Sequence, residues 1–156
     1  MVKKYKDIWF DDFTIGRVFL TESSCITGEE IIAFGKKYAP LPYHTDPNKA
    51  KEYMFGELVA AGFHTCSVSF GLFIESGILD ACAMGSPGFN KLRWRKPVLP
   101  GDRLQVKSTV TNVSPARDDK GRNLVTMLFE TFNQDKELVL EMETKHYVRD
   151  RPSSYG

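Results

Sequence analysis

The stretch from Gly62 to about Ala83, GFHTCSVSFGLFIESGILDACA, is the feature that most constrains the fold. It is apolar on nearly all sides, with serine, glycine and alanine interspersed, and a helix that is apolar all round has to be buried. The stretch is too polar and too interrupted to span a membrane, and no other window approaches the roughly 20 apolar residues that a span requires. We therefore predict one long buried helix, ended by the turn-forming run 84–88.

The second half of the sequence is predicted to form the strands that cover this helix. Residues 89–98 are one candidate strand, closed by the turn Pro100-Gly101-Asp102. From 104 to 111 the residues alternate with a period of two, which is typical of a strand with one face in water. Turn signals then separate two further strands, expected at 123–132 and 138–148.

The first part of the chain supplies one more strand and a helix. Residues 1–15 are interpreted as a lead-in whose aromatic side chains anchor it on the core, and 16–26 is predicted to be a strand. Thr27 is a good N-cap, and Glu30 three residues later completes a capping box. We expect the helix that begins there to end near Lys37.

A turn-rich segment follows, from Tyr38 to Thr45. Because it contains Pro40 and Pro42, it is predicted to be a stiff, non-helical loop. Asp46-Pro47 then starts a short helix from 48 to about 53, with the carboxylate as its cap and the proline at the first helical position.

These elements predict a single α+β domain over residues 1–156. A sheet made largely of neighbouring hairpins is antiparallel, and it would wrap the one buried helix. Since the helix needs cover on every side, a second copy of the chain is expected to supply what the sheet leaves open. A homodimer or higher homo-oligomer is therefore predicted.

Composition excludes several classes of function. The 21 basic and 20 acidic residues leave a formal net charge of +1, which argues against a nucleic-acid partner because such binding depends on paired phosphates. The three cysteines have no CxxC spacing, so buried, reduced thiols are expected rather than disulfides or a zinc site. No apolar run of signal-peptide length occurs near the N-terminus. We expect a cytoplasmic protein with no metal and no membrane partner.

A resemblance to a known family is carried by three runs: Pro42-Tyr43-His44-Thr45-Asp46-Pro47, Phe55-Gly56 and Ala61-Gly62-Phe63-His64-Thr65. Together with Arg95-Lys96-Pro97-Val98, they resemble the MaoC-like dehydratases, relatives of the (R)-specific enoyl-CoA hydratases. The resemblance extends from about Asp11 to Arg149. It implies a hot-dog fold, an antiparallel sheet wrapped around one long helix, assembled as dimers. It also implies hydration or dehydration of acyl thioesters of coenzyme A or a carrier protein, in fatty acid metabolism, without a metal or redox cofactor.

The chain departs from the family's motif at one position. The motif has an aspartate five residues before its histidine; the histidine is His44 here, but the aspartate is replaced by Ala39. One of the two groups that share the acid–base work in the family is therefore missing.

The chemistry that the resemblance implies needs a base for water, a proton for the α-carbon and stabilisation of the enolate oxygen. His44 is the candidate base, because histidine commonly serves as a base at neutral pH. The alternative is that its ring only binds the loop backbone. Gly62 is the candidate oxyanion donor at a helix N-terminus, where free N–H groups carry partial positive charge. The alternative is a plain helix start at which glycine relieves packing.

Substrate-binding candidates surround these two residues. Ala39 occupies the place of the missing carboxylate, and Tyr43 could hold a water, although a phenol is a weak base. Phe63 either belongs to the core or lines an acyl tunnel, and His64 is either a cavity residue or a satisfied core histidine. Arg93 and Arg95 share a strand face and suit the phosphates of coenzyme A, although a solvated strand face explains them slightly better.

Three functions remain open on this evidence. The first is a hydro-lyase of the MaoC-like type. The second is a non-catalytic acyl-thioester binding or regulatory protein, for which Ala39 is the direct motivation. The third is an acyl-thioester hydrolase, because one fold hosts several chemistries.

Overall fold

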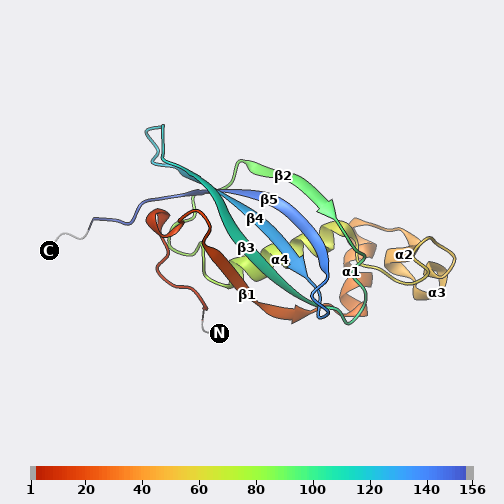
Figure 1. Ribbon diagram of the computed structural model, residues 1–156. Coiled ribbons are helices and arrows are strands. Elements are labelled where there is room, and N and C mark those ends of the chain that lie inside the picture. Colours follow the sequence, from red (N-terminus) through yellow and green to blue (C-terminus); the bar gives the residue numbers. More distant parts are fainter. Residues whose placement is uncertain (1–2, 154–156) are drawn as a thin grey trace.

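The computed structural model describes residues 3–153 of the chain. Its elements in chain order are η1 (Phe10–Asp12), β1 (Val18–Cys25), α1 (Gly28–Tyr38), α2 (Pro42–Thr45), α3 (Pro47–Ala50), α4 (Gly62–Glu75), β2 (Gly88–Trp94), β3 (Arg103–Ser114), β4 (Asn123–Phe132) and β5 (Leu138–Val148). Figure 1 shows that the strands form one sheet and that α1, α2 and α3 are grouped beyond one end of it.

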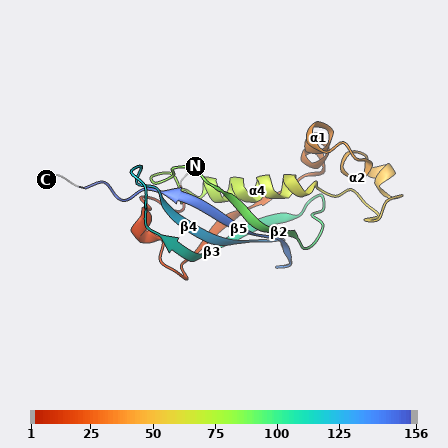
Figure 2. The same cartoon turned by 90° about the horizontal axis from the view of Figure 1, so that it is seen from above.

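The sheet has the strand order β1-β3-β4-β5-β2, and all of its neighbouring pairs are antiparallel. Consecutive hairpins make the middle of the sheet, and β1 and β2 form its two edges. Figure 2 shows α4 lying along one face of the sheet. The predicted α+β architecture, an antiparallel sheet packed on one helix, is confirmed.

Local sequence signals account for the helix starts. The Thr27 hydroxyl accepts a hydrogen bond from the Glu30 N–H at 3.1 Å, and the Glu30 carboxylate accepts one from the Thr27 N–H at 3.3 Å. This reciprocal pair is the predicted capping box, and it satisfies two N–H groups at the start of α1. Asp46 caps α3 as predicted, accepting from the Asn48 N–H at 2.9 Å, although α3 ends at Ala50, earlier than expected.

The segment before α3 is partly helical, which corrects the prediction of a non-helical loop. Pro42 stands at the first helical position of α2, where its missing N–H costs nothing and its fixed φ suits the helix. Pro42 therefore starts a turn of helix, and His44 lies on that turn.

Helix α4 ends at Glu75, several residues before the predicted end near Ala83. Gly77 has φ of +91° and turns the chain, and a side chain at that position would come within 2.3 Å of the Tyr5 carbonyl oxygen. The apolar residues that follow α4 remain buried in the core as irregular backbone rather than as helix.

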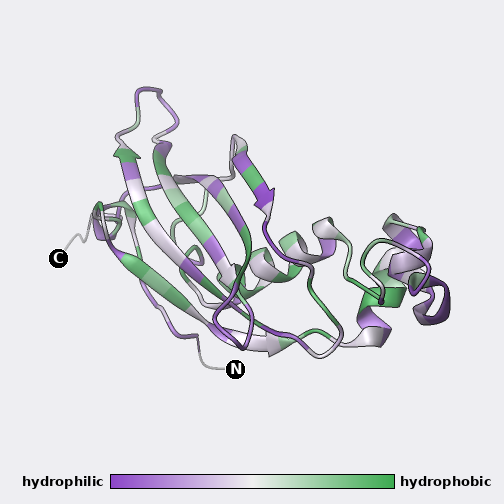
Figure 3. Ribbon diagram, turned by 45° about the vertical axis from the view of Figure 1, so that its right-hand side comes forward, coloured by the Kyte–Doolittle hydropathy of each residue, from purple (hydrophilic) through white to green (hydrophobic). Residues whose placement is uncertain are grey.

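The sheet packs one face on α4. On β3 the side chains of Leu104, Val106, Ser108 and Val110 are buried, as the period of two predicts. Figure 3 shows hydrophobic and hydrophilic positions alternating along the central strands. The rings of Phe73 on α4 and Phe129 on β4 meet at 4.7 Å between centroids, which places the core between helix and sheet.

The face of α4 turned away from the sheet is not covered by residues 3–153. Phe63 is 67% exposed, and Trp94 on the edge strand β2 is 47% exposed. The prediction of a helix buried all round is therefore met on the sheet side only.

The cysteines also differ from expectation. All three are free thiols, but only Cys82 is buried, while Cys25 is exposed. Burial raises the pKa of the Cys82 thiol to about 11, so it stays protonated at neutral pH. Within residues 3–153, no helix combines the length and the apolar character that crossing a bilayer would take.

His146 is a buried histidine in the aromatic part of the core. Its ring lies among those of Phe70, Phe73 and Phe129, with centroids between 5.4 and 6.5 Å away, and its Nε2 is 2.9 Å from the Thr144 hydroxyl. Burial lowers the pKa of His146 to about 4, because the charged imidazolium loses its hydration there.

We predict that this histidine makes the fold sensitive to acid. Above pH 6.5, its ordinary pKa, both folded and unfolded states carry a neutral ring. As the pH falls from 6.5 towards 4, only the unfolded state binds the proton, so the free energy of unfolding should drop by about 3 kcal/mol over that window. Urea unfolding between pH 7 and 4 measures this. A His146→Leu variant should show a correspondingly flatter curve; equal slopes for both proteins would contradict the assignment.

Candidate active site

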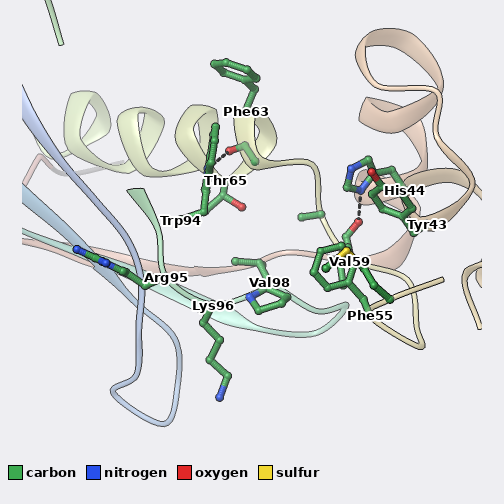
Figure 4. A pocket seen from close by; sticks show the side chains of 14 residues that line it. Tyr43, His44, Phe55, Val59, Phe63, Thr65, Trp94, Arg95, Lys96 and Val98 are labelled. Atoms are coloured by element: carbon green, nitrogen blue, oxygen red, sulfur yellow. Dashed lines mark hydrogen bonds between the residues drawn. The ribbon is translucent and has the colours of Figure 1, made fainter. Parts of the chain in front are cut away.

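A cavity of about 380 Å³ opens at the N-terminal end of α4, between that helix and the α2–α3 lobe. Figure 4 shows the side chains that line it. They come from three segments far apart in sequence: Tyr43, His44, Met54 and Phe55; Val59, Ala60, Gly62, Phe63 and Thr65; and Trp94, Arg95, Lys96, Pro97 and Val98. The wall is mostly apolar, with a few polar groups, which is typical of a small-molecule site.

His44 is held in place by backbone contacts on both sides. Its carbonyl oxygen lies against α1, so close that a Cβ on Gly35 would come within 2.4 Å of it. Its ring Nδ1 lies 2.7 Å from the Val59 carbonyl oxygen, on the segment that leads into α4 (Figure 4). The side chain is 8% exposed. Gly35 and Val59 together fix the orientation of the imidazole.

The bond to Val59 determines which ring nitrogen of a neutral His44 carries the proton. A carbonyl oxygen can only accept, so Nδ1 must donate, and this leaves an unprotonated lone pair on Nε2. Within residues 3–153 no protein group is hydrogen-bonded to Nε2. The imidazole therefore binds the backbone, as one interpretation of the sequence had it, and also keeps one nitrogen available as a base.

Gly62 begins α4 with its Cα against an indole ring. The Trp94 Nε1–H donates to the Gly62 carbonyl oxygen at 2.9 Å, and a Cβ on Gly62 would lie 2.4 Å from Cε2 of that ring. Packing alone thus requires glycine here. Among residues 3–153, the N–H groups of Gly62 and Phe63 donate to no protein acceptor, so the start of the helix also offers two free donors.

Two other predicted residues face different hollows. Ala39 caps α1 at its C-terminal end and lines a space of about 440 Å³ with Phe34, Tyr38 and Phe63. His64 stacks on Phe34, with centroids 4.6 Å apart and planes 4° from parallel, and does not line the cavity of His44. Its Nδ1 is buried without a hydrogen-bond partner in the part of the chain that the structure describes. Burial lowers the pKa of His64, and the nearby Glu30 carboxylate offsets part of that shift.

The basic residues at positions 93, 95 and 96 do not all lie at the cavity. Arg95 and Lys96 line the cavity, whereas Arg93 does not. Arg95 donates from Nε to the Glu141 carboxylate at 2.9 Å, and Lys96 is paired with Glu137. Both cavity-lining cations thus already have an anionic partner on the exposed rim, where such pairs contribute little to stability and exchange easily.

Some parts of the site have no sequence signal. The Val59 carbonyl is a backbone group, which every residue type carries, so its role cannot be recognised from the sequence. The contact between Trp94 and Gly62 depends on how the edge strand β2 packs against α4. Tyr43 lines the cavity, and the centroid of its ring lies 4.5 Å from that of His44 and 5.6 Å from that of Phe55.

Comparison with known proteins identifies the family. The model of the MaoC-like domain matches residues 12–128. The chain belongs to the MaoC-like dehydratase family. This MaoC-like chain is 34% identical to the uncharacterized protein YdeM of Bacillus subtilis over 139 residues, which are 89% of this chain and 97% of that protein.

Solved structures show the same fold. The crystal structure of the MaoC-like dehydratase from Rhodospirillum rubrum superposes with a TM-score of 0.86 at 30% identity, covering 94% of this chain and all of that one. The (R)-hydratase PhaJ1 from Pseudomonas aeruginosa superposes with a TM-score of 0.74 at 21% identity, covering 96% and 97% of the two chains. The MaoC-like chain thus has the hot-dog fold that its sequence resemblance implied.

Proposed function

We propose that this MaoC-like protein is a hydro-lyase that adds water to, or removes it from, an enoyl thioester, with His44 as its base. The observation that supports this most directly is the unprotonated, unpartnered Nε2 of His44, fixed by the bond from Nδ1 to Val59 in the same cavity as the free N–H groups at the start of α4. A base and an oxyanion site on one apolar cavity are what such a reaction needs.

In the hydration direction, Nε2 of His44 takes a proton from water as the water oxygen bonds to the β-carbon. The π electrons of the carbon–carbon double bond move toward the thioester carbonyl, whose oxygen gains negative charge. The N–H groups of Gly62 and Phe63 stabilise that charge, aided by the partial positive charge of the helix terminus. The proton held on His44 then reaches the α-carbon, which completes the addition, and dehydration reverses these steps.

The proposed substrate is an acyl-CoA or an acyl-carrier thioester. The aromatic rings of Tyr43, Phe55 and Phe63 offer the acyl part an apolar wall. Arg95 and Lys96 at the rim suit the phosphates of the carrier, once those phosphates replace Glu141 and Glu137 as their partners.

The test is a hydration assay on the purified chain. Crotonyl-CoA and enoyl-CoAs of longer chain are mixed with the protein, and loss of the enoyl absorbance is followed together with release of free thiol. Loss of absorbance without thiol release is the expected result. Thiol release would instead identify a thioesterase, and no change in either signal would overturn the hydro-lyase proposal.

One observation favours a second candidate, a protein that binds acyl thioesters without converting them. Ala39 cannot act as an acid or base, and it faces a hollow that the family's carboxylate would enter. Calorimetry with butyryl-CoA decides this case: tight binding together with no turnover of any enoyl-CoA would support it, and absence of binding would exclude it.

We also propose that the protein is a homodimer. The uncovered face of α4 and the edge strand β2 carry the exposed aromatic residues Phe63, Phe89 and Trp94, a concentration of apolar surface that a second copy would bury. Light scattering coupled to gel filtration should give twice the 17.7 kDa mass of the chain. A monomer at micromolar concentration would contradict the proposal.

A further inference from the structure

Helix α4 begins without the local stabilisation that starts α1. Its N-cap is Ala61, whose side chain cannot accept a hydrogen bond, and none of the residues of its first turn is acidic. Gly62, its first residue, is a poor helix former. A capping side chain accepts from the N–H groups of the first turn, so on α4 it would occupy a donor that lies at the cavity. If those N–H groups are to stay free, another contact has to hold the start of this helix.

Trp94 on the edge strand β2 supplies such a contact. Its Nε1–H donates to the Gly62 carbonyl oxygen at 2.9 Å, the bond drawn as a dashed line at Trp94 in Figure 4. Its ring packs so close to Gly62 that a Cβ there would come within 2.4 Å of it. The same ring meets that of Phe63 edge to face, with centroids 5.6 Å apart. Trp94 thus holds the first turn of α4 by a carbonyl group and occupies none of its N–H groups.

The Gly62 carbonyl and the Phe63 N–H belong to the same peptide unit. Because a peptide unit is planar, fixing the direction of its carbonyl oxygen also fixes the direction of its N–H. In a helix the N–H points the opposite way from the carbonyl, toward the N-terminus, which for α4 is the end at the cavity. A hydrogen bond accepted by the carbonyl also polarises the peptide unit and strengthens its N–H as a donor.

We infer that Trp94 is a positioning residue, whose indole N–H orients and polarises the peptide between Gly62 and Phe63 so that the Phe63 N–H donates to a thioester carbonyl oxygen. This inference rests on the proposed function, in which that N–H stabilises the enolate oxygen in the cavity of His44. An indole has a single N–H and no acceptor. Since that N–H is already bound to Gly62, Trp94 acts on the reaction through the peptide and not by a hydrogen bond of its own to the substrate.

The test is the substitution Trp94→Phe, which keeps an aromatic ring beside Gly62 and removes the N–H. We expect kcat for hydration of crotonyl-CoA to fall about tenfold. This is less than the roughly 10²–10³-fold loss that follows removal of an oxyanion donor itself, because the Phe63 N–H is still present. Butyryl-CoA, measured by calorimetry, should bind within about twofold of the wild-type affinity, since the interaction is strongest when the oxygen carries negative charge.

Infrared difference spectroscopy of bound butyryl-CoA reads the strength of the donor without any turnover. A hydrogen bond accepted by the thioester carbonyl lowers its stretching frequency. We expect this frequency to fall when butyryl-CoA binds to the wild type and to fall less when it binds to Trp94→Phe. A residue that only packs against the start of the helix would leave the frequency unchanged.

Trp9→Phe is the matched control, because it makes the same change at the other tryptophan of the chain. The Trp9 indole N–H donates to the Asp7 carboxylate at 2.6 Å, and Trp9 is not among the residues that line the cavity. This variant also loses a hydrogen bond, so its melting temperature should fall. Its kcat and the carbonyl frequency of its bound ligand should remain those of the wild type.

The outcomes distinguish this inference from the proposed function. If no enoyl-CoA is turned over but the fall in carbonyl frequency is smaller in Trp94→Phe than in the wild type, the hydro-lyase proposal fails and the role of Trp94 stands. If Trp94→Phe leaves the carbonyl frequency unchanged, the role of Trp94 is overturned, whatever the turnover. A wild type that binds no thioester at all would overturn both.

Discussion

Replacing His44 with glutamine should lower the rate constant for hydration of crotonyl-CoA by about 10²–10⁴-fold, the usual contribution of a positioned general base. Glutamine keeps a side chain that can donate to the Val59 carbonyl oxygen, now the acceptor for Nδ1 at 2.7 Å, but it has no basic nitrogen. Binding of butyryl-CoA should therefore change little while turnover is lost. Stopped-flow measurement of the enoyl absorbance gives the rate, and calorimetry gives the affinity.

The same substitution at His64 serves as the comparison, because this second histidine of the motif region stacks on Phe34 and lies outside the cavity of His44. Its effect on the rate should be much smaller. If His44→Gln retained the wild-type rate, or if His64→Gln caused the larger loss, the assignment of the base would be wrong.

Replacing Ala39 with aspartate should raise the hydration rate by about 10²-fold, because it restores the carboxylate that the family's motif places five residues before the histidine. The hollow beside Ala39 is separate from the cavity of His44 but shares Phe63 with it, so the prediction requires the carboxylate to reach past that ring. A negative charge at the C-terminal end of α1 is unfavourable by about 0.3–1 kcal/mol, so a slightly lower melting temperature is expected. Lys36 and Lys37 in the last turn of that helix offset part of this cost.

Ala39→Asn is the matched control, since asparagine has the shape of aspartate without its basicity. Only the aspartate variant should gain activity. A wild type with no turnover and an active Ala39→Asp would mean that the natural chain binds thioesters without converting them. An active wild type that gains nothing from aspartate would mean that another group already does this work.

The fold could largely be predicted because its signals are local. Thr27 with Glu30, and Asp46 with Pro47, specify helix starts through bonds made within one turn, and the alternation along β3 specifies which face is buried. The end of α4 could not be predicted. It depends on the approach of Gly77 to the backbone of Tyr5, a contact between residues far apart in the chain.

The candidate site was predictable only in part. His44 was identified by its motif, and the structure places it on the same cavity as Gly62. The motif carries no information about the carbonyl of Val59, which selects the tautomer, or about Trp94, which covers Gly62. Ala39 ends α1, His44 lies on α2 and His64 lies on α4, and each lines a different hollow because the three elements present them on different surfaces.

The contact between Gly35 and the backbone of His44 attaches the proposed base to α1, apart from the proposed oxyanion donors on α4. The imidazole is attached to α1 and α2, which lie beyond the end of the sheet (Figure 1). The amide donors belong to α4, the helix packed on the sheet. The strip from Val59 to Ala60 links the two: Val59 donates to the Tyr43 carbonyl oxygen and Ala60 to the Val98 carbonyl oxygen, each at 2.9 Å. In the proposed function, the distance between the base and the amide donors therefore depends on how α1 and α2 pack against the rest of the chain. Substitutions in α1 would thus change the distance between the groups proposed to perform the chemistry without altering those groups themselves.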